Sequence, residues 1–296
     1  MIGLGIDAGG SATRWVLSDA DGTVIRRGDL PPVTGHLFNP QARSRFDAML
    51  AELRDMVAGE LPARVIAGIT GLSASAPEAG QAVELLAAAL GIAPERVFVT
   101  DDVWVACRTA FAPGEGHVVY AGSGSIGVHV RADGTSVRVG GRGMLIDDGG
   151  SAFWIGREAL CLVWRRIDDG ITTPSQLADA LFAAIGGGGW DQVRAFVYGG
   201  ERRAVAMLAM AVAQADDADA RAILRRAGME LARLGQALIR REGVRPVALV
   251  GRAATLHPEI GVGFREAAPE IAVQVVEVDA ALSAARMAGN GTRITK

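Results

Sequence analysis

The pattern of apolar and polar positions begins with three short runs typical of β-strands, at residues 2–7, 13–18 and 23–29. Asp21-Gly22, between the second and third run, is a strong hairpin signal. Apolar residues at helical spacing follow over 41–57 and 78–90, and a short apolar run at 97–100 ends in Asp101-Asp102. The first part of the chain therefore predicts an antiparallel meander followed by alternating helices and strands.

The meander pattern returns later in the chain, with strand-like runs at 118–121, 126–131 and 136–139. Its turn, Asp133-Gly134, stands 112 residues after Asp21-Gly22. Repetition at this distance indicates a duplicated domain rather than a solenoid. We therefore expect one domain over 1–112 and another over 113–296. The second carries a helical insertion within 174–241, broken at 186–189 and near 216–217, and a last helix that can pack back on the N-terminal domain.

Composition and charge argue against some classes of function. The 296-residue chain is 50% hydrophobic with a formal net charge of −3, which allows two cores and gives no basic field for nucleic acid or an anionic membrane. The longest apolar run, 204–213, is too short to span a bilayer, and the N-terminus enters a strand without a signal-peptide core. We expect a cytoplasmic protein whose cysteines, Cys107 and Cys161, are reduced core thiols.

Two short loops carry glycine and small hydroxyl residues at equivalent positions of the repeat. The first contains Gly9, Gly10, Ser11 and Thr13, and the second contains Gly122, Ser123, Gly124 and Ser125. Glycine lets backbone N–H groups approach a phosphate, and hydroxyls add donors without negative charge. A matched pair of such loops predicts polyphosphate held between the domains, whereas either loop alone is equally consistent with a structural hairpin.

Acidic residues beside these loops give the candidate chemistry. Asp7 stands just before the first loop, where a carboxylate near phosphate calls for a cation, so it is a candidate Mg²⁺ ligand, directly or through water. In Asp101-Asp102, between a strand and a helix, one carboxylate can cap the helix while the other is a candidate general base. The alternatives are turn capping by Asp7 and helix capping by both later acids.

These motifs, together with Gly140-Gly141 and Gly150-Ser151-Ala152, come in the order and spacing of one family. Over essentially its whole length the chain resembles the N-acetylglucosamine kinase and BadF/BadG/BcrA/BcrD ATPase family of the actin, Hsp70 and sugar-kinase superfamily. The resemblance implies an α/β fold of two duplicated ribonuclease H-like, actin-like ATPase domains. Such domains close over ATP and Mg²⁺ in an interdomain nucleotide cleft.

The resemblance also implies roles for individual residues. Asp102 matches the catalytic base, and the two glycine loops match the phosphate-binding loops for ATP. Adenosine binding is implied for Ala213, Gly251 and Arg252. Sugar binding is implied for a larger set: Thr34, Gly35, His36, Thr70, Gly71, Asp102, Ser125, Gly140, Gly141, Arg142 and Asp148.

Several positions depart from the pattern of the family. Arg142 stands where the family commonly has Trp, Asp147 where it has Gly, Gly149 where it has Glu, and Gly35 where it often has Asn; Arg252 replaces the second glycine of the adenosine motif. A site that lacks one hydrogen-bonding partner loses discrimination between substrates. The resemblance therefore does not fix the sugar. Arg142 could bind an anionic substituent such as a lactyl or phosphate group, or it could be a solvated arginine.

The leading interpretation is an ATP-dependent carbohydrate kinase that phosphorylates a hydroxyl of glucosamine, N-acetylglucosamine or a related sugar, with Asp102 as general base. One alternative is a BadF-type ATPase that activates a partner reductase, but neither Cys107 nor Cys161 lies in a cluster-binding motif. Another is a catalytically weak sugar or nucleotide sensor, which the altered segment 142–149 favours. The expected partner is a small-molecule sugar, and no nucleic acid or membrane partner is expected. The sequence leaves open whether the protein forms a homodimer.

Overall fold

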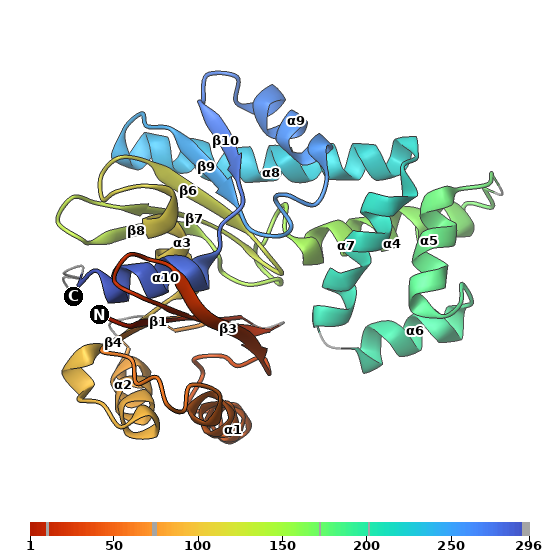
Figure 1. Ribbon diagram of the computed structural model, residues 1–296. Helices are drawn as coiled ribbons and strands as arrows, with labels where there is room; N and C mark the ends of the chain where they lie inside the picture. Colours follow the sequence, from red (N-terminus) through yellow and green to blue (C-terminus); the bar gives the residue numbers. More distant parts are fainter. Residues whose placement is uncertain (10–11, 73–75, 172, 201, 292–296) are drawn as a thin grey trace. The chain divides into compact units, whose positions relative to one another are not determined.

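The computed structural model describes residues 1–9, 12–72, 76–171, 173–200 and 202–291 (Figure 1). The chain divides into two compact units. The first comprises Met1–Thr109 and the C-terminal segment from Val278, and the second comprises Ala110–Glu277. Each unit contains one five-stranded mixed sheet. The sequence analysis assigned the last helix to the second domain and noted that it can pack back on the N-terminal domain. In the structure this helix belongs to the first unit.

The first sheet has the strand order β3-β2-β1-β4-β5. An antiparallel meander is followed by two strands parallel to β1: β1 (Gly3–Ala8), β2 (Thr13–Ser18), β3 (Val24–Leu30), β4 (Arg64–Ile69) and β5 (Val97–Thr100). The helices of this unit are α1 (Pro40–Met56), α2 (Pro77–Leu90), η1 (Pro94–Arg96), α3 (Asp102–Ala110) and α10 (Ala280–Gly289). The predicted meander and its Asp21-Gly22 turn are confirmed.

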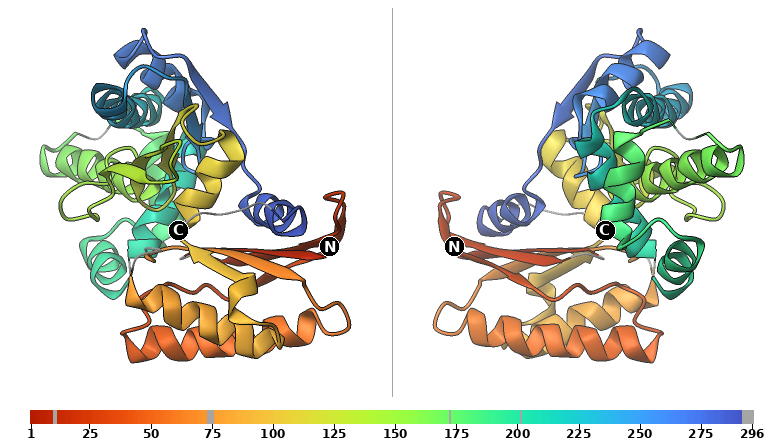
Figure 2. Two further views of the ribbon diagram at one scale, coloured as in Figure 1. Left: turned by 90° about the vertical axis from the view of Figure 1, so that its left-hand side faces the viewer. Right: turned by 90° about the vertical axis from the view of Figure 1, so that its right-hand side faces the viewer.

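Residues of β1 alternate between the two faces of this sheet. Leu4 and Ile6 are buried in the core formed with α1 and α2. On the opposite face a Cβ atom added to Gly5 would collide with the backbone oxygen of Ala281 in α10. Figure 2 shows α1 and α2 on one side of the sheet and α10 on the other. The helix lies directly on the strand because glycine leaves room for its backbone.

The second sheet has the order β10-β9-β6-β7-β8, which repeats the arrangement of the first. Its strands are β6 (His117–Ala121), β7 (Ser125–Val130), β8 (Ser136–Gly140), β9 (Val247–Val250) and β10 (Val273–Val276). The first three form an antiparallel meander, and β9 and β10 run parallel to β6. The predicted α/β fold of two duplicated domains is confirmed.

Six helices complete the described part of the second unit: α4 (Ala152–Asp168), α5 (Gln176–Ile185), α6 (Trp190–Gly199), α7 (Arg202–Ala215), α8 (Ala218–Glu242) and α9 (Pro258–Ala267). The expected breaks at 186–189 and 216–217 are present. A further break, at Gly200, separates α6 from α7 in a stretch that the sequence predicts as helical. Within the described residues, no helix is long and apolar enough to cross a membrane.

Replacing Gly5 with alanine should destabilise the first unit, because α10 would have to move away from β1. We expect Gly5→Ala to lower the free energy of unfolding by about 1–3 kcal/mol in a denaturant titration. Gly80→Ala in α2 is the matched control, since nothing lies within 4 Å of its added Cβ. That change should raise stability by about 0.5–1 kcal/mol. Equal effects of the two substitutions would contradict the close packing of α10.

Candidate functional site

The parallel strands of the first sheet carry the candidate residues at one edge. In the strand register, Asp7 of β1 lies beside Gly68 of β4, and Gly68 lies beside Thr100 of β5. Asp101 and Asp102 follow Thr100 directly. Carboxyl ends of parallel strands are the usual ligand-binding edge of an α/β sheet. The fold therefore brings Asp7 and Asp102 to the same edge, although 94 residues separate them in the sequence.

The two acids after β5 differ in their hydrogen bonds. Asp101 is 9% exposed, and its carboxylate accepts a hydrogen bond of 2.6 Å from the backbone N–H of Trp104, which caps α3. Asp102 is half-buried and accepts a bond of 3.0 Å from the N–H of Val103. Capping by one of the two carboxylates is thus confirmed, and the capping residue is Asp101.

The electrostatic environment of Asp102 favours its protonated form. Burial raises the pKa of this carboxyl to about 7, and the negative charges of Asp7 and Asp101 contribute to the increase. The backbone N–H of Val103 acts in the opposite direction, because it stabilises the carboxylate. A carboxyl that titrates near neutrality can accept a proton and release it again, which is the property needed of a general base.

Gly68 determines how closely Asp102 approaches the sheet. A Cβ atom at this position would lie 2.9 Å from a methyl carbon of Val105 and 3.0 Å from the Cα of Asp102. Both distances are shorter than normal packing allows, so any larger residue would displace the first turn of α3. The absence of a side chain at Gly68 therefore contributes to the crowding of acids at this edge.

The predicted sugar-binding residues of the first unit lie on two adjoining segments. The N–H of Gly35 donates to the carbonyl of Thr70 over 2.9 Å, and the imidazole of His36 lies against Gly71, whose φ is +74°. Thr34 and Thr70 are half-buried and His36 is exposed. The structure therefore brings these residues together beyond the end of β4.

The first predicted phosphate loop is only partly visible, because Gly10 and Ser11 lie outside the described residues. The N–H of Gly9 donates to the carbonyl of Ala12 over 3.0 Å, which forms a tight turn. Thr13 is buried, and its hydroxyl donates to the carbonyl of Pro31 over 2.9 Å. The hydroxyl of Thr13, at the start of β2, is thus engaged inside the protein.

A hollow of about 480 Å³ lies beside Asp7 in the first unit. Its charged lining residues are Asp7, Arg14, Arg27, Asp29 and Asp279. Arg27 pairs with Asp279 at 3.1 Å, and Arg14 lies 3.7 Å from Asp29. Three acids against two arginines suit a cation, or an anion that carries a cation, better than a bare phosphate.

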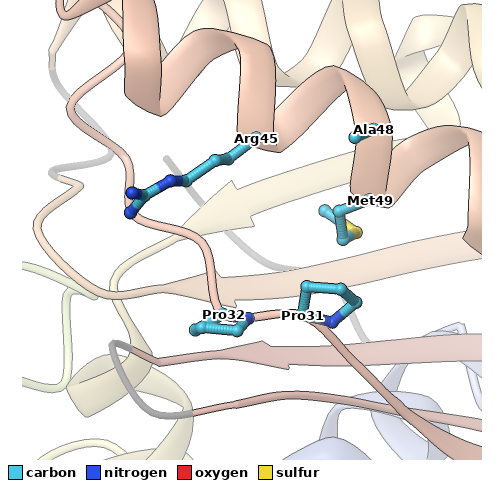
Figure 3. Close-up of a pocket in the computed structure, with 5 residues that line it drawn as sticks. All are labelled: Pro31, Pro32, Arg45, Ala48 and Met49. Carbon is cyan, nitrogen blue, oxygen red and sulfur yellow. The ribbon is translucent and has the colours of Figure 1, made fainter.

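A smaller and almost wholly apolar hollow of about 240 Å³ lies between the chain after β3 and α1 (Figure 3). Pro31 and Pro32 form one wall, Ala48 and Met49 of α1 form the other, and Arg45 lies at the rim. None of these residues was a predicted site residue, so this hollow is separate from the candidate chemistry.

The second glycine loop is fixed to the segment that begins α4. The hydroxyl of Ser125 donates to the carbonyl of Gly149 over 2.7 Å, and the N–H of Ala152 donates to the carbonyl of Gly122 over 2.9 Å. Ser151 accepts a bond of 3.2 Å from the N–H of Trp154 and so caps α4. These bonds hold the loop against the start of α4.

Asp148 connects this loop to the helical insertion. It is 3% exposed and has a φ of +67°, and its Oδ1 atom accepts a bond of 3.2 Å from the N–H of Ser125. Its Oδ2 atom pairs with Arg202 at 2.7 Å. The predicted sugar-binding carboxylate is thus already bonded on both oxygens. Sequence reasoning missed Arg202, because its partner lies 54 positions away.

The remaining predicted residues lie at and after the end of β8, directly after β9, and on α7. Gly140 and Gly141 have φ values of +69° and +68°, and Arg142 is exposed. Gly251 also has a positive φ, +98°, and a Cβ there would collide with the carbonyl oxygen of Ala121. Arg252 is exposed and Ala213 is half-buried on α7. Gly251 is therefore at the end of β9, against the end of β6.

Among the described residues, no group of three or more His, Cys, Asp or Glu side chains is arranged to hold a metal ion.

Solved structures similar to this chain have the same architecture. A "putative N-acetylglucosamine kinase" from Chromobacterium violaceum is 26% identical, with a TM-score of 0.75 over 96% of this chain and 98% of that one. A second protein so described, from Porphyromonas gingivalis, is 18% identical with a TM-score of 0.77 over 98% and 99% of the two chains. A ROK family glucokinase from Streptomyces griseus, in complex with glucose and AMPPNP, is 14% identical with a TM-score of 0.58 over 96% and 98%.

The family model of the BadF/BadG/BcrA/BcrD ATPases matches residues 4–259. This range includes both meanders, Asp7, Asp101-Asp102, the second glycine loop and Gly251. It therefore covers most of the chain and every described element up to the start of α9. The chain belongs to the BadF/BadG/BcrA/BcrD ATPase family.

Proposed function

We propose that the protein is an ATP-dependent kinase that transfers the γ-phosphate of ATP to a hydroxyl of an amino sugar, such as glucosamine or N-acetylglucosamine. Asp102 is the general base. The observation that carries the proposal is the position of Asp102 at the carboxyl edge of the first sheet, beside Asp7, with a pKa raised to about 7. The likeness to sugar kinases supports the same conclusion.

In this reaction Asp102 acts on the attacking hydroxyl. Its carboxylate accepts the hydroxyl proton while the oxygen forms a bond to the γ-phosphorus and the bond from that phosphorus to the bridging oxygen of ADP breaks. Alignment and neutralisation of charge contribute most of the rate enhancement in phosphoryl transfer, and the base contributes a smaller factor. Gly68 and the cap formed by Asp101 hold Asp102 in place for this role.

Asp7 is suited to bind Mg²⁺, directly or through water. Its charge already raises the pKa of Asp102, so a neighbouring divalent cation would relieve that repulsion and return Asp102 toward its carboxylate form. Bound Mg²⁺ would neutralise negative charge on the phosphates of ATP. The acidic balance of the hollow beside Asp7 supports this assignment.

Each unit has candidate residues for sugar specificity. In the first unit, Thr34, His36 and Thr70 lie on adjoining segments beyond β4 and are at least partly exposed, so their side chains can hydrogen-bond to sugar hydroxyls. In the second unit the exposed Arg142 follows Gly140 and Gly141 on the loop after β8. Because a guanidinium binds carboxylates and phosphates strongly, sugars with an acidic substituent belong among the substrates to be tested.

The positions of the two cysteines argue against the alternative that the protein is an ATPase that activates a partner reductase. Cys107 is buried in α3 and Cys161 is half-buried in α4. An iron–sulfur cluster is held by cysteine thiolates at characteristic spacings, and neither residue lies in a cluster-binding motif. A sensor without turnover would bind ATP and sugar but release no ADP, so an activity assay separates it from the kinase.

The first test measures ADP release by the purified protein with MgATP and a panel of glucose, glucosamine, N-acetylglucosamine and muramic-type sugars. We expect an amino sugar to stimulate turnover and Asp102→Asn to lower kcat by about 10²–10⁴-fold, with little change in KM for ATP. Asp47→Asn, which removes an exposed acid of α1, is the control and should retain activity. Absence of stimulation by every sugar, or full activity of Asp102→Asn, would contradict the proposal.

The second test concerns stability and pH. At pH values between the pKa of unfolded aspartate and about 7, Asp102 keeps its proton in the folded protein and loses it in the unfolded chain. The contribution of this proton to the free energy of unfolding is therefore lost as the pH rises through about 7. The Asp102→Asn variant has no carboxyl proton at this position, so its free energy of unfolding does not fall in this way. We expect the variant to be about 1–3 kcal/mol more stable than the original protein at pH 8, but not at pH 4.

Denaturant unfolding at both pH values measures this difference directly. Asp55→Asn, at an exposed ion pair whose aspartate is 71% accessible, is the control and should change stability by less than about 1 kcal/mol at either pH. A stability difference for Asp102→Asn that is the same at pH 4 and pH 8 would show that Asp102 titrates normally and is not poised as a base.

A further inference from the structure

The second glycine loop has few hydrogen-bond donors left for a ligand. The N–H of Gly122 donates to the carbonyl of Gly124 over 2.8 Å, and the N–H of Ser125 donates to Asp148. Within the described chain, the N–H groups of Ser123 and Gly124 are left without a protein acceptor, and Ser123 is exposed. Two uncharged amides can orient a phosphate, but they do little to balance its charge.

Arg202 supplies a positive charge at this loop. A Cβ atom on Gly124 would lie 2.5 Å from Nη2 of Arg202 and 2.8 Å from Oδ1 of Asp148. The guanidinium therefore lies directly against the backbone of the loop. Its side chain is 35% exposed, so a ligand at the loop can reach it.

Asp148 holds the guanidinium without using all its donors. One nitrogen, Nη2, pairs with Oδ2 of Asp148, whose side chain is only 4% exposed. The Nε atom of Arg202 is buried and has no hydrogen-bond partner in the part of the chain that the structure describes. A guanidinium has five N–H donors in a fixed plane, which suits phosphate oxygens. Several donors of Arg202 therefore remain for a ligand beside the loop.

We propose that Arg202 binds the phosphate groups of the nucleotide together with Ser123 and Gly124, and that Asp148 positions it; this inference rests on the proposed use of ATP. The same helix carries Ala213, which was predicted to line the adenine pocket. Ala213 comes eleven positions after Arg202, or about 16 Å along a helix. Helix α7 thus has the length to follow a nucleotide from its base to its phosphates.

Nucleotide binding by the full chain tests this proposal without any need for turnover. Titration calorimetry with MgATP, MgADP and AMP should show that Arg202→Met weakens MgATP at least about 10-fold and AMP less than about 2-fold. Arg202→Lys, which keeps the charge but not the planar donor set, should lie between Arg202→Met and the original protein. Arg203→Met, on the exposed neighbouring arginine, is the matched control and should bind all three nucleotides normally.

Loss of Arg202 leaves Asp148 buried and unpaired, so stability is measured alongside binding. If Arg202→Met does not fold, the double variant Asp148→Asn/Arg202→Met removes both charges, and asparagine tolerates the positive φ at that position. This variant should fold and show the same selective loss of MgATP. Unchanged MgATP binding, or equal weakening of MgATP and AMP, would overturn the assignment. Absence of nucleotide binding by the original protein would overturn both this inference and the proposed function.

Discussion

Crowding of three carboxylates at one edge of the first sheet is the constraint on which the candidate chemistry depends. The register places Asp7 beside Gly68, and α3 begins close enough to this glycine that its first turn lies against the strand. Burial and mutual repulsion then raise the pKa of Asp102. An arrangement that holds like charges together is unfavourable for the isolated fold, and a cation or a transferred proton relieves it. The features that strain this edge are therefore the ones that suit it to phosphoryl transfer.

In the second unit the acid Asp148 has a different environment from that of Asp102, although the sheet repeats the same topology. Asp148 is bonded to Ser125 and paired with Arg202, whereas Asp102 faces the charges of Asp7 and Asp101. The two carboxylates therefore lie in contrasting environments: Asp102 is close to like charges, and Asp148 is bonded on both oxygens. Asp148 therefore acts first as the support of the second loop. Any contact it makes with a sugar would have to come from lone pairs that Ser125 and Arg202 do not use.

The sequence predicted the features that depend on local pattern. Alternation and turn residues identified both meanders, and the repeat between them identified the duplicated sheets. It could not show which helix covers Gly5, because a glycine in a strand does not reveal its partner. It also missed the pairing of Asp148 with Arg202, which only the folded chain brings together. Long-range contacts between polar residues have no periodic signal.

The loop after β8, which departs most from the family pattern, is held by contacts at its base and is exposed at its tip. Asp147 pairs with Arg233 of α8 at 3.0 Å, and Gly150 packs against Leu231 of the same helix. Toward the tip, Leu145 is 92% exposed, and Arg142 is exposed as well. A residue at an exposed tip can change without disturbing the packing that holds the loop. Arginine at position 142 is therefore accommodated without any change to the packing at the base of the loop. In the proposed kinase, substrate choice can thus vary independently of the residues around Asp102.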